Sequence, residues 1–377
     1  MRNYDVVVVG LGAMGSAALY ALAQRGRRVI GIDRFEPGHD LGSSYGESRI
    51  IRMAYYEDPV YVPLLRLAYE AWGRLESHTG EQLLTITGIL EAGVEGSALV
   101  EGSLRSALQH DIPHEMLLPA QVNRRFPAFS IPPDWHCVFQ PDAGILQPEK
   151  AINMFVKSAS QLGASVALGT RVDSVLPVGE HVEVQLESGE TIEAGSAVIA
   201  VGPWIQDLVP ELGSNMRLTR QPLMWFEPLE RQLVLPQCMP VFFFDTPDDL
   251  IYGFPDFRGS GVKIGSHLSG GELTSADEIR AEVSDAEKAH LKRMMARYIP
   301  AAAGRVQQTH VCIYTRSTDE HFVLGLHPSA SQIVLASPCS GHGFKFASIF
   351  GEILADLAMS RATDKPIDFF RPNRLIG

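Results

Sequence analysis

The chain has 377 residues, of which 45% are hydrophobic and 20% are charged. Such a composition is typical of a globular protein, and the length allows two interlocked domains. The net charge of −12 argues against a nucleic acid partner, because an acidic surface repels phosphates, but it allows a local basic pocket for a small anion.

Cysteine usage and apolar runs bear on the compartment. Cys137, Cys238, Cys312 and Cys339 share no spacing typical of metal ligands, so we expect no metal site. So few cysteines in so long a chain favour a reducing compartment over a disulfide-bonded scaffold. The apolar run at 6–9 is too short for a signal peptide. The sequence contains no stretch of roughly 18 apolar residues, so it predicts no membrane span. We therefore expect a cytoplasmic protein without a membrane partner.

A strand–helix–strand unit is predicted at the start of the chain. Residues 6–9 are all valine, which is typical of a strand buried on both faces. A glycine turn at 10–15 follows, and then an alanine- and leucine-rich helix at 16–25 that ends near Gly26. A second strand at 29–32 completes a βαβ unit.

Hydrophobic periodicity predicts the later elements. A period near 3.6 indicates a helix, whereas alternation or a short continuous apolar run indicates a strand. Helices are predicted at 61–79, 148–162, 276–297 and 345–359, and strands at 182–186, 197–202, 250–254, 262–265 and 333–336.

These elements predict an α/β fold with two domains. One is a discontinuous, Rossmann-like doubly wound domain that is suited to a dinucleotide. The other is a mostly antiparallel sheet that binds the substrate. We assign residues 1–85, 145–212 and 311–377 to the first domain and residues 86–144 and 213–310 to the second.

Gly10, Gly12 and Gly15 match the dinucleotide-binding fingerprint. The first glycine allows a tight turn, the second a close approach of the backbone to a pyrophosphate, and the third close packing of helix on strand. Asp33 follows Gly15 by 18 residues, where a carboxylate can bind a ribose. The order of these features predicts a dinucleotide without separating FAD from NAD. The alternative is a glycine-rich turn that binds no nucleotide.

Two arginines follow this unit in a loop of small residues. Arg49 and Arg52 carry permanent charges suited to a carboxylate, a phosphate or an electron-rich ring. The alternative, preferred when the loop is considered alone, is a pair of surface arginines neutralised by Glu47 and Glu57.

The segment 341–345 follows the last predicted strand and opens the last predicted helix. Backbone N–H groups at a helix start stabilise a developing negative charge, such as that of a reduced flavin. The alternative is an ordinary helix entry with Lys345 in solvent.

Together these segments resemble the monomeric sarcosine oxidase family, which includes N-methyltryptophan oxidase. The resemblance is carried by the N-terminal fingerprint and by matches in chain order at 42–55, 252–255, 262–267, 312–315, 319–322 and 340–346. The later matches are specific to this family rather than to nucleotide-binding folds in general.

The resemblance implies roles for individual residues. Cys312 matches the cysteine that attaches FAD through a thioether, and Lys263 matches the lysine that promotes reaction with O2. Arg52 and Lys345 match the pair that binds the substrate carboxylate. Arg49 matches an arginine packed against the flavin.

The remaining candidates line the substrate cavity or contact the cofactor in that family. The candidate catalytic residues are Lys263, Arg49, Tyr252, Tyr314 and His267. The candidate cofactor-binding residues are Gly10, Gly12, Gly15, Asp33, Ser43, Ser48, Arg49, Gly202, Cys312, Gly341, Gly343, Phe344 and Lys345.

This chain departs from the family pattern at two places. Tyr45 stands where better-known members have a histidine near the flavin. Phe243 and Phe244 lie ahead of Tyr252, in a stretch that contributes to the substrate cavity in relatives. Both departures bear on the substrate more than on the reaction class.

The resemblance implies a monomeric enzyme with covalent FAD that oxidises the C–N bond of a secondary-amine amino acid such as sarcosine. O2 accepts the electrons, and the products are an imine or aldehyde, a primary amine and H2O2. Three alternatives stay open: a flavin oxidase or dehydrogenase of a cyclic, glycated or D-amino acid, an NAD-dependent dehydrogenase with unmodified Cys312, and a nucleotide-binding protein without catalysis.

Overall fold

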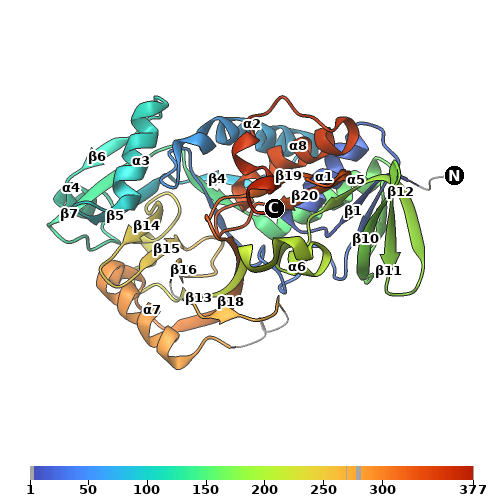
Figure 1. The fold of residues 1–377 in the computed structure, drawn as a ribbon. Coiled ribbons are helices and arrows are strands. Elements are labelled where there is room, and N and C mark those ends of the chain that lie inside the picture. The colour runs from blue at the N-terminus through green and yellow to red at the C-terminus, as the bar shows by residue number, and fades with distance from the viewer. Residues whose placement is uncertain (1–3, 269, 277–281, 377) are drawn as a thin grey trace.

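The computed structural model describes residues 4–268, 270–276 and 282–376. Its architecture rests on two large β-sheets, the first covered by a layer of helices (Figure 1). Within the described ranges no helix combines the length and the apolarity that crossing a membrane requires.

The first sheet has a parallel centre flanked by antiparallel strands. Parallel pairs join β1 to β2 and β12, β12 to β20, and β2 to β9. Its strands are β10 (Val172–Val178), β11 (His181–Leu186), β12 (Thr191–Ile199), β1 (Tyr4–Val9), β2 (Val29–Ile32), β9 (Ser165–Ala167), β20 (Ala330–Ser337) and β19 (Val323–His327).

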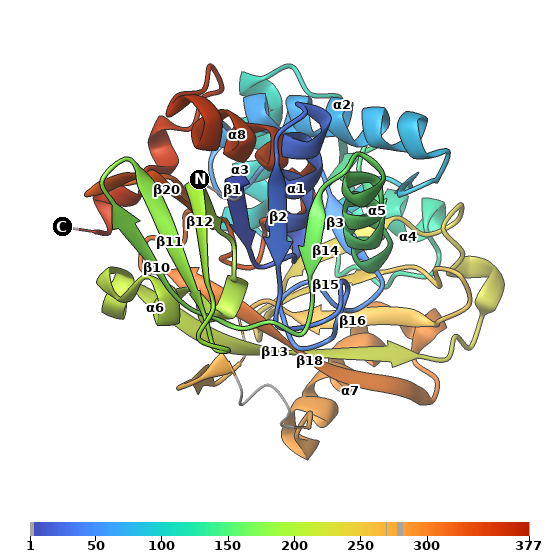
Figure 2. The same ribbon diagram turned by 90° about the vertical axis from the view of Figure 1, so that its right-hand side faces the viewer.

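Alternation along β1 explains why its valines suit both faces of this sheet. Val6 and Val8 belong to the core cluster that includes the helices, whereas Val7 and Val9 belong to the cluster on the opposite face. The helices on the first of these faces are α1 (Ala13–Gln24), α2 (Val62–Thr79), α5 (Pro148–Gln161) and α8 (Ala347–Ser360). Figure 2 shows α1 between α8 and α5, and α1 contacts both of these helices.

The second sheet is antiparallel except for one parallel pair, β5 with β14. Its strands are β17 (Glu272–Leu273), β13 (Met216–Phe226), β16 (Val262–Ser266), β15 (Leu250–Phe254), β14 (Val241–Asp245), β5 (Ile89–Val94), β7 (Trp135–Gln140), β6 (Glu115–Leu117) and β18 (Val306–Ser317). The long pair β13 and β18 lies beneath the carboxyl ends of β1 and β2 (Figure 2).

Smaller elements complete the fold. A third sheet contains β3 (Arg49–Ile51), β8 (Gly144–Leu146) and β4 (Leu84–Ile86). The remaining helices are α3 (Ala98–Gln109), α4 (Pro119–Arg125), α6 (Ile205–Leu208) and α7 (Asp285–Tyr298). Short 3-10 helices occupy Pro59–Tyr61, Gly202–Trp204, Pro210–Asn215, Arg231–Leu233, Pro300–Ala302, Phe344–Phe346, Asp368–Phe370 and Pro372–Arg374.

The predicted α/β fold class is confirmed, with corrections to individual elements. The strand predicted at 197–202 ends at Ile199, because Gly202 begins a 3-10 helix. The helix predicted at 276–297 begins at Asp285, where Ser284 provides the N-terminal cap; residues 277–281 of that prediction lie outside the described residues. The predicted boundary at 311 falls inside β18, and the domain limits stay predictions.

Candidate active site

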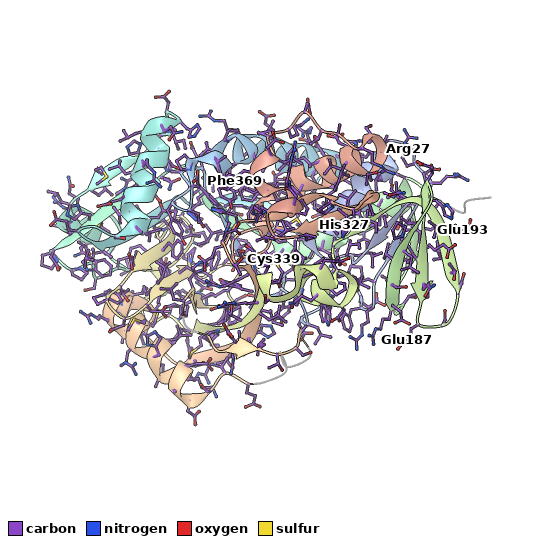
Figure 3. All side chains as sticks on the ribbon, viewed as in Figure 1. Arg27, Glu187, Glu193, His327, Cys339 and Phe369 are labelled. Atoms are coloured by element: carbon purple, nitrogen blue, oxygen red, sulfur yellow. The ribbon has the colours of Figure 1, made fainter. Side chains whose placement is uncertain are left out.

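A large pocket lies where the two sheets meet. It encloses about 1990 Å³ of empty space when its open mouth is included. Its walls come from the carboxyl ends of β1 and β2, the segment 33–57, strand β18 and the segment 338–345. Cys339, one of its lining residues, lies near the middle of the molecule in Figure 3, whereas Glu193 of the first sheet lies at the periphery.

The glycine turn after β1 has the geometry that the fingerprint predicts. Gly10 has a φ of +88°, and a Cβ there would lie 2.6 Å from the carbonyl oxygen of Ala200. A Cβ on Gly15 would lie 1.7 Å from the carbonyl oxygen of Gly10, whereas one on Gly12 would meet nothing within 4 Å. The turn is therefore tight on its inner side and open toward the pocket, which Gly12 borders.

Asp33 braces this turn from the end of β2. Its Oδ2 accepts a hydrogen bond of 2.5 Å from the backbone N–H of Leu11, and its Oδ1 accepts one of 2.7 Å from Phe35. Burial raises the pKa of this carboxyl group. Asp33 borders the pocket, and its contact with a ribose stays a prediction.

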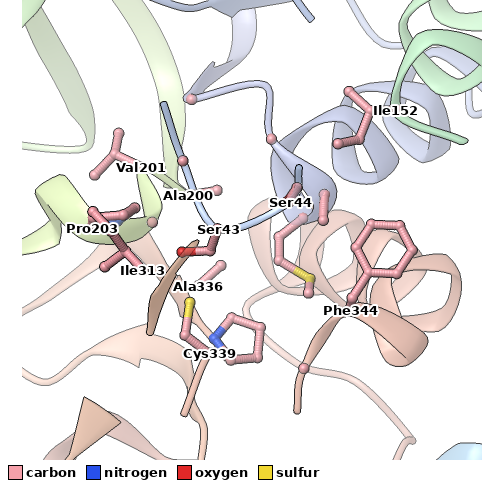
Figure 4. A pocket seen from close by; sticks show the side chains of 18 of the residues that line it. Ser43, Ser44, Ile152, Ala200, Val201, Pro203, Ile313, Ala336, Cys339 and Phe344 are labelled. Carbon is pink, nitrogen blue, oxygen red and sulfur yellow. The ribbon is translucent and has the colours of Figure 1, made fainter. Parts of the chain in front are cut away.

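Two buried polar atoms support occupancy of this pocket by a large polar ligand. The hydroxyl of Ser43 and the indole N–H of Trp204 are buried without a partner among the described residues, and both residues border the pocket. Figure 4 shows Val201 and Pro203 on one side of the pocket and Phe344 on the other. An elongated cofactor with polar groups along its length, such as FAD, fits these donors and the open side of the glycine turn.

Arg49 and Cys312 meet at the wall formed by β18. The guanidinium Nη2 donates to the carbonyl oxygens of Ser43 (2.9 Å) and Tyr45 (2.6 Å). The same nitrogen lies 3.8 Å from the Cys312 sulfur. Cys312 is a free thiol that borders the pocket. Its sulfur therefore lies at the wall of the cavity, beside a permanent cation held by backbone oxygens.

Lys263 lies beneath the segment that carries Arg49 and is buried rather than solvated. Its ammonium donates to the carbonyl oxygens of Gly46 (2.6 Å) and Ser48 (3.1 Å) and to the Ser48 hydroxyl (3.2 Å). Burial, and then the charge of Arg49, hold the pKa of Lys263 well below its usual value. Lys263 lies on β16 and is only 1% exposed, so its side chain does not point to solvent.

Arg52 borders the same pocket and holds two carboxylates. Its Nη2 donates to both oxygens of Glu57 (2.8 and 2.7 Å), and its Nη1 donates to Glu91 (3.3 Å). Burial opposes ionisation of Glu57, but the charge of Arg52 lowers the pKa of that carboxyl group to about 2. The alternative of a surface pair is confirmed for the partner, because Arg52 pairs with Glu57. It is wrong for the location, because Arg52 is only 2% exposed.

Lys345 lies close to Arg52, and both cations contact the ring of Tyr55. Its ammonium donates to the His342 carbonyl oxygen (2.8 Å) and to the Tyr55 hydroxyl (3.4 Å). The Tyr55 ring lies 4.6 Å from the Arg52 guanidinium carbon and 5.1 Å from the Lys345 ammonium. Burial, reinforced by Arg52, lowers the pKa of Lys345 to about 7. The alternative of a solvated Lys345 is therefore wrong.

Aromatic rings wall the cavity next to these cations. The Tyr314 hydroxyl donates to the Tyr252 hydroxyl at 3.4 Å. The His267 ring lies 5.4 Å from the Tyr314 ring and 5.6 Å from the Phe243 ring. Burial lowers the pKa of His267 to about 3, so its ring is neutral at neutral pH. Phe243 borders the pocket, whereas Phe244 belongs to a core cluster of the second sheet.

The structure brings most of the candidate residues to one pocket. Those that border it are Gly10, Gly12, Asp33, Ser43, Arg49, Arg52, Gly202, Tyr252, His267, Cys312, Tyr314, Gly341, Gly343, Phe344 and Lys345. Gly15, Ser48 and Lys263 support this wall from behind. Tyr45 packs its ring against His310 with centroids 4.4 Å apart.

Sequence reasoning missed several groups at the cation end. Glu57 was considered only as a surface partner, and Glu91, Tyr55 and His342 had no predicted role. The one available signal for Glu57 is its place five residues after Arg52. Nothing local in the sequence distinguishes the buried Glu91, which is 0% exposed, from a surface glutamate.

Comparisons with known proteins identify the family and the fold of the chain. The sequence profile of the family described as FAD dependent oxidoreductase matches residues 5–357. A monomeric sarcosine oxidase of Streptomyces avermitilis is 37% identical over 99% of this chain and 98% of the relative. An N-methyl-L-tryptophan oxidase of Yersinia pestis is 32% identical over 97% of each chain. The open form of NikD, an unusual amino acid oxidase essential for nikkomycin biosynthesis, has a TM-score of 0.87 at 26% identity, over 99% of this chain and 98% of NikD.

Proposed function

The chain belongs to the FAD dependent oxidoreductase family, and we propose that it oxidises the C–N bond of a small secondary-amine amino acid, such as an N-methyl amino acid. The observation that carries this proposal is the pairing of two buried cations, Arg52 and Lys345, with a cavity walled by aromatic rings. The cations suit a carboxylate and the rings suit an apolar amine. The sarcosine and N-methyltryptophan oxidases named above act on amino acids of this type according to their names.

Carboxylate binding by Arg52 involves an exchange of anions. Arg52 and Glu57 both border the pocket, and Glu57 occupies the Nη2 atom of the guanidinium. A substrate carboxylate would take the place of Glu57 on this atom. Lys345 would contribute the second cation, because it borders the same pocket and its ammonium contacts the same Tyr55 ring as Arg52.

The same residues set the protonation state of the substrate amine. An amine must be neutral before it can give up a hydride from its neighbouring carbon. Nearby cations and an apolar wall disfavour an ammonium ion, and the neutral His267 ring adds no opposing charge. The site therefore favours the deprotonated amine, and it orients that amine through the carboxylate held at Arg52.

FAD, when bound, supplies the acceptor for this hydride and passes the electrons to O2. The residues that would hold it are the glycine turn at 10–15, Asp33, Ser43, Arg49 and the segment 341–345. We also propose that Cys312 attaches the cofactor covalently, since this residue borders the pocket and its sulfur lies beside Arg49. The cation of Lys263 would stabilise the negative charge that O2 acquires on reduction.

Two further expectations belong to this proposal. The sarcosine oxidase of Streptomyces avermitilis is monomeric according to its name, which supports a monomer. All four cysteines are free thiols, which supports a reducing compartment, and we propose the cytoplasm.

A peroxide-coupled screen of N-methyl, cyclic, glycated and D-amino acids tests the proposed function. We expect H2O2 release with at least one N-methyl amino acid and little with the corresponding primary amino acid. If only a cyclic, glycated or D-amino acid released H2O2, that compound class would replace N-methyl amino acids as the proposed substrates. If none of these compounds released peroxide from the yellow holoenzyme, amino acid oxidation by O2 would be contradicted.

A further inference from the structure

Two carboxylates share the guanidinium of Arg52, and they differ in their surroundings. Glu57 borders the pocket and binds Nη2. Glu91 binds Nη1 from the side of the second sheet and is 0% exposed. The pocket lining, as far as the chain is described, includes Arg52 and Glu57 and does not include Glu91. Glu91 therefore lies behind Arg52, where a substrate does not displace it.

Glu91 is anchored by its own hydrogen-bond network. It lies on β5, beside β7, which carries Gln140. Its Oε2 accepts a hydrogen bond of 2.6 Å from Nε2 of Gln140, and Oε1 of that amide accepts one of 2.8 Å from the backbone N–H of Ala54. The network thus links Ala54 to Gln140, Gln140 to Glu91, and Glu91 to Arg52, so it begins and ends in the segment that carries Arg52. It fixes the guanidinium on the side that faces away from the pocket.

We propose that Glu91 is a positioning residue that holds Arg52 toward the pocket and, through its own charge, sets how tightly Arg52 binds the carboxylate of the substrate. This inference rests on the proposed function, in which Arg52 binds that carboxylate. It assigns a fixed role to one partner of the guanidinium and an exchangeable role to the other, Glu57.

The physical basis is competition of two anions for one cation. An ionised Glu91 reduces the attraction of Arg52 for a second carboxylate, whereas a protonated Glu91 still accepts a hydrogen bond but does not compete. A buried pair of cations without such a counter-ion would also hold the carboxylate of the product, which slows its release. Glu91 therefore lowers affinity in a way that suits turnover.

The environment of Glu91 supports a change of charge near neutral pH. Burial, opposed by the charge of Arg52, raises the pKa of Glu91 to about 7. The groups around it are Arg52 and Glu57 from the segment 52–57, Gln140 from β7 and Ser103 from α3, with Lys345 acting at longer range. Because Glu57 has a pKa of about 2, it stays ionised while Glu91 titrates.

The test is the affinity of the holoenzyme for acetate, a carboxylate without an amine, measured by isothermal titration calorimetry. At about pH 8.5, Glu91→Gln should bind acetate on the order of tenfold more tightly than the wild type, because one negative charge near the anion is gone. At about pH 6 the two proteins should bind acetate almost equally, since Glu91 is then protonated in the wild type. Titration of Lys345 is common to both proteins and largely cancels in the ratio.

Glu57→Gln is the matched control on the other nitrogen of the same guanidinium. It should tighten acetate binding by a similar factor at every pH, because Glu57 does not titrate in this range. A purely structural role of Glu91 predicts weaker acetate binding in Glu91→Gln at all pH values, and this result would overturn the inference. An effect of Glu91→Gln on acetate affinity that did not vary with pH would contradict a change in the charge of Glu91 in this pH range.

Two outcomes separate this inference from the proposed function. If neither Arg52→Ala nor Glu57→Gln changes acetate affinity, Arg52 does not bind the carboxylate and the proposed function fails. If both change it and Glu91→Gln does not, only the inference about Glu91 fails. Should Glu91→Gln not fold, Lys345→Met provides the test: its acetate affinity should still fall between about pH 6 and about pH 8.5, and a flat profile would contradict the role of Glu91.

Discussion

The carboxylate of Glu57 accepts two hydrogen bonds, 2.8 and 2.7 Å long, from a single nitrogen of Arg52, Nη2. The cation that would bind the substrate carboxylate thus already holds a carboxylate of the protein. Substrate affinity at this end is therefore a difference between two buried ion pairs rather than the full strength of one.

Removal of Arg52 should affect amino acids and simple amines differently. We expect Arg52→Ala to lower kcat/KM for an amino acid substrate by about 2–5 kcal/mol in transition-state free energy, as for other desolvated charge pairs. A carboxylate-free analogue of the same amine should lose far less. Arg125→Ala, at an exposed pair with Glu115, is the matched control and should change neither substrate. Equal losses for both substrates would show that Arg52 does not bind the carboxylate.

The state of Lys345 should make anion binding depend on pH. Its pKa is lowered to about 7 by burial and by Arg52, so its charge is present below that pH and is lost as the pH rises through it. The inhibition constant of acetate should therefore increase between about pH 6 and about pH 8.5. The increase should be smaller in Lys345→Met, in which only Glu91 still titrates in this range. An identical pH profile in the variant would show that Lys345 does not contribute.

Covalent attachment at Cys312 has a direct mass signature. Intact-mass measurement of the denatured wild type should show the chain with FAD attached, at the summed mass less the thiol hydrogen and one flavin hydrogen, because a thioether survives denaturation. Cys312→Ser should lack this addition. Cys339→Ser is the matched control, since Cys339 also borders the pocket, and it should keep the adduct. An adduct that is retained in Cys312→Ser and lost in Cys339→Ser would reassign the attachment.

Much of the fold could be predicted because its central unit is local in sequence. The structure contains the predicted strands at 6–9 and 29–32 as neighbours in the first sheet. The glycine turn follows the first of these strands, as predicted. The long pair β13 and β18 was not predicted as a pair, because its residues lie about 90 positions apart in the chain and pair only in the folded protein. The start of α7 was predicted wrongly for a local reason: the capping box formed by Ser284 and Glu287 begins the helix at Asp285.

The candidate site was predictable where a residue has a distinctive motif and not where its role comes from burial. Cys312 and Lys263 were assigned through sequence matches, and their burial appears only in the structure. Glu91 faces Arg52 because β5 and the segment after β3 meet in space. A glutamate within the stretch Ile89–Val94 gives no sign in the sequence that its pKa is raised.

Lys263 should serve the reaction with O2 rather than the oxidation of substrate. A cation at about 4 Å stabilises the charge on reduced oxygen by roughly 4 kcal/mol at an intermediate dielectric, which corresponds to about a thousandfold in rate. In stopped-flow experiments on Lys263→Met, anaerobic reduction by substrate should change little and reoxidation by O2 should slow by orders of magnitude. Reoxidation at the wild-type rate would assign oxygen activation to another cation, and Arg49 would be the next candidate.

Amino acid oxidation by this flavoprotein is tested most directly by an anaerobic titration of the purified holoenzyme, followed by the visible absorbance of its flavin. We predict that an N-methyl amino acid bleaches this absorbance stoichiometrically, that NADH and NADPH do not, and that admission of O2 restores the colour with release of H2O2. Bleaching by a nicotinamide nucleotide but by no amino acid would contradict the proposed oxidation of amino acids.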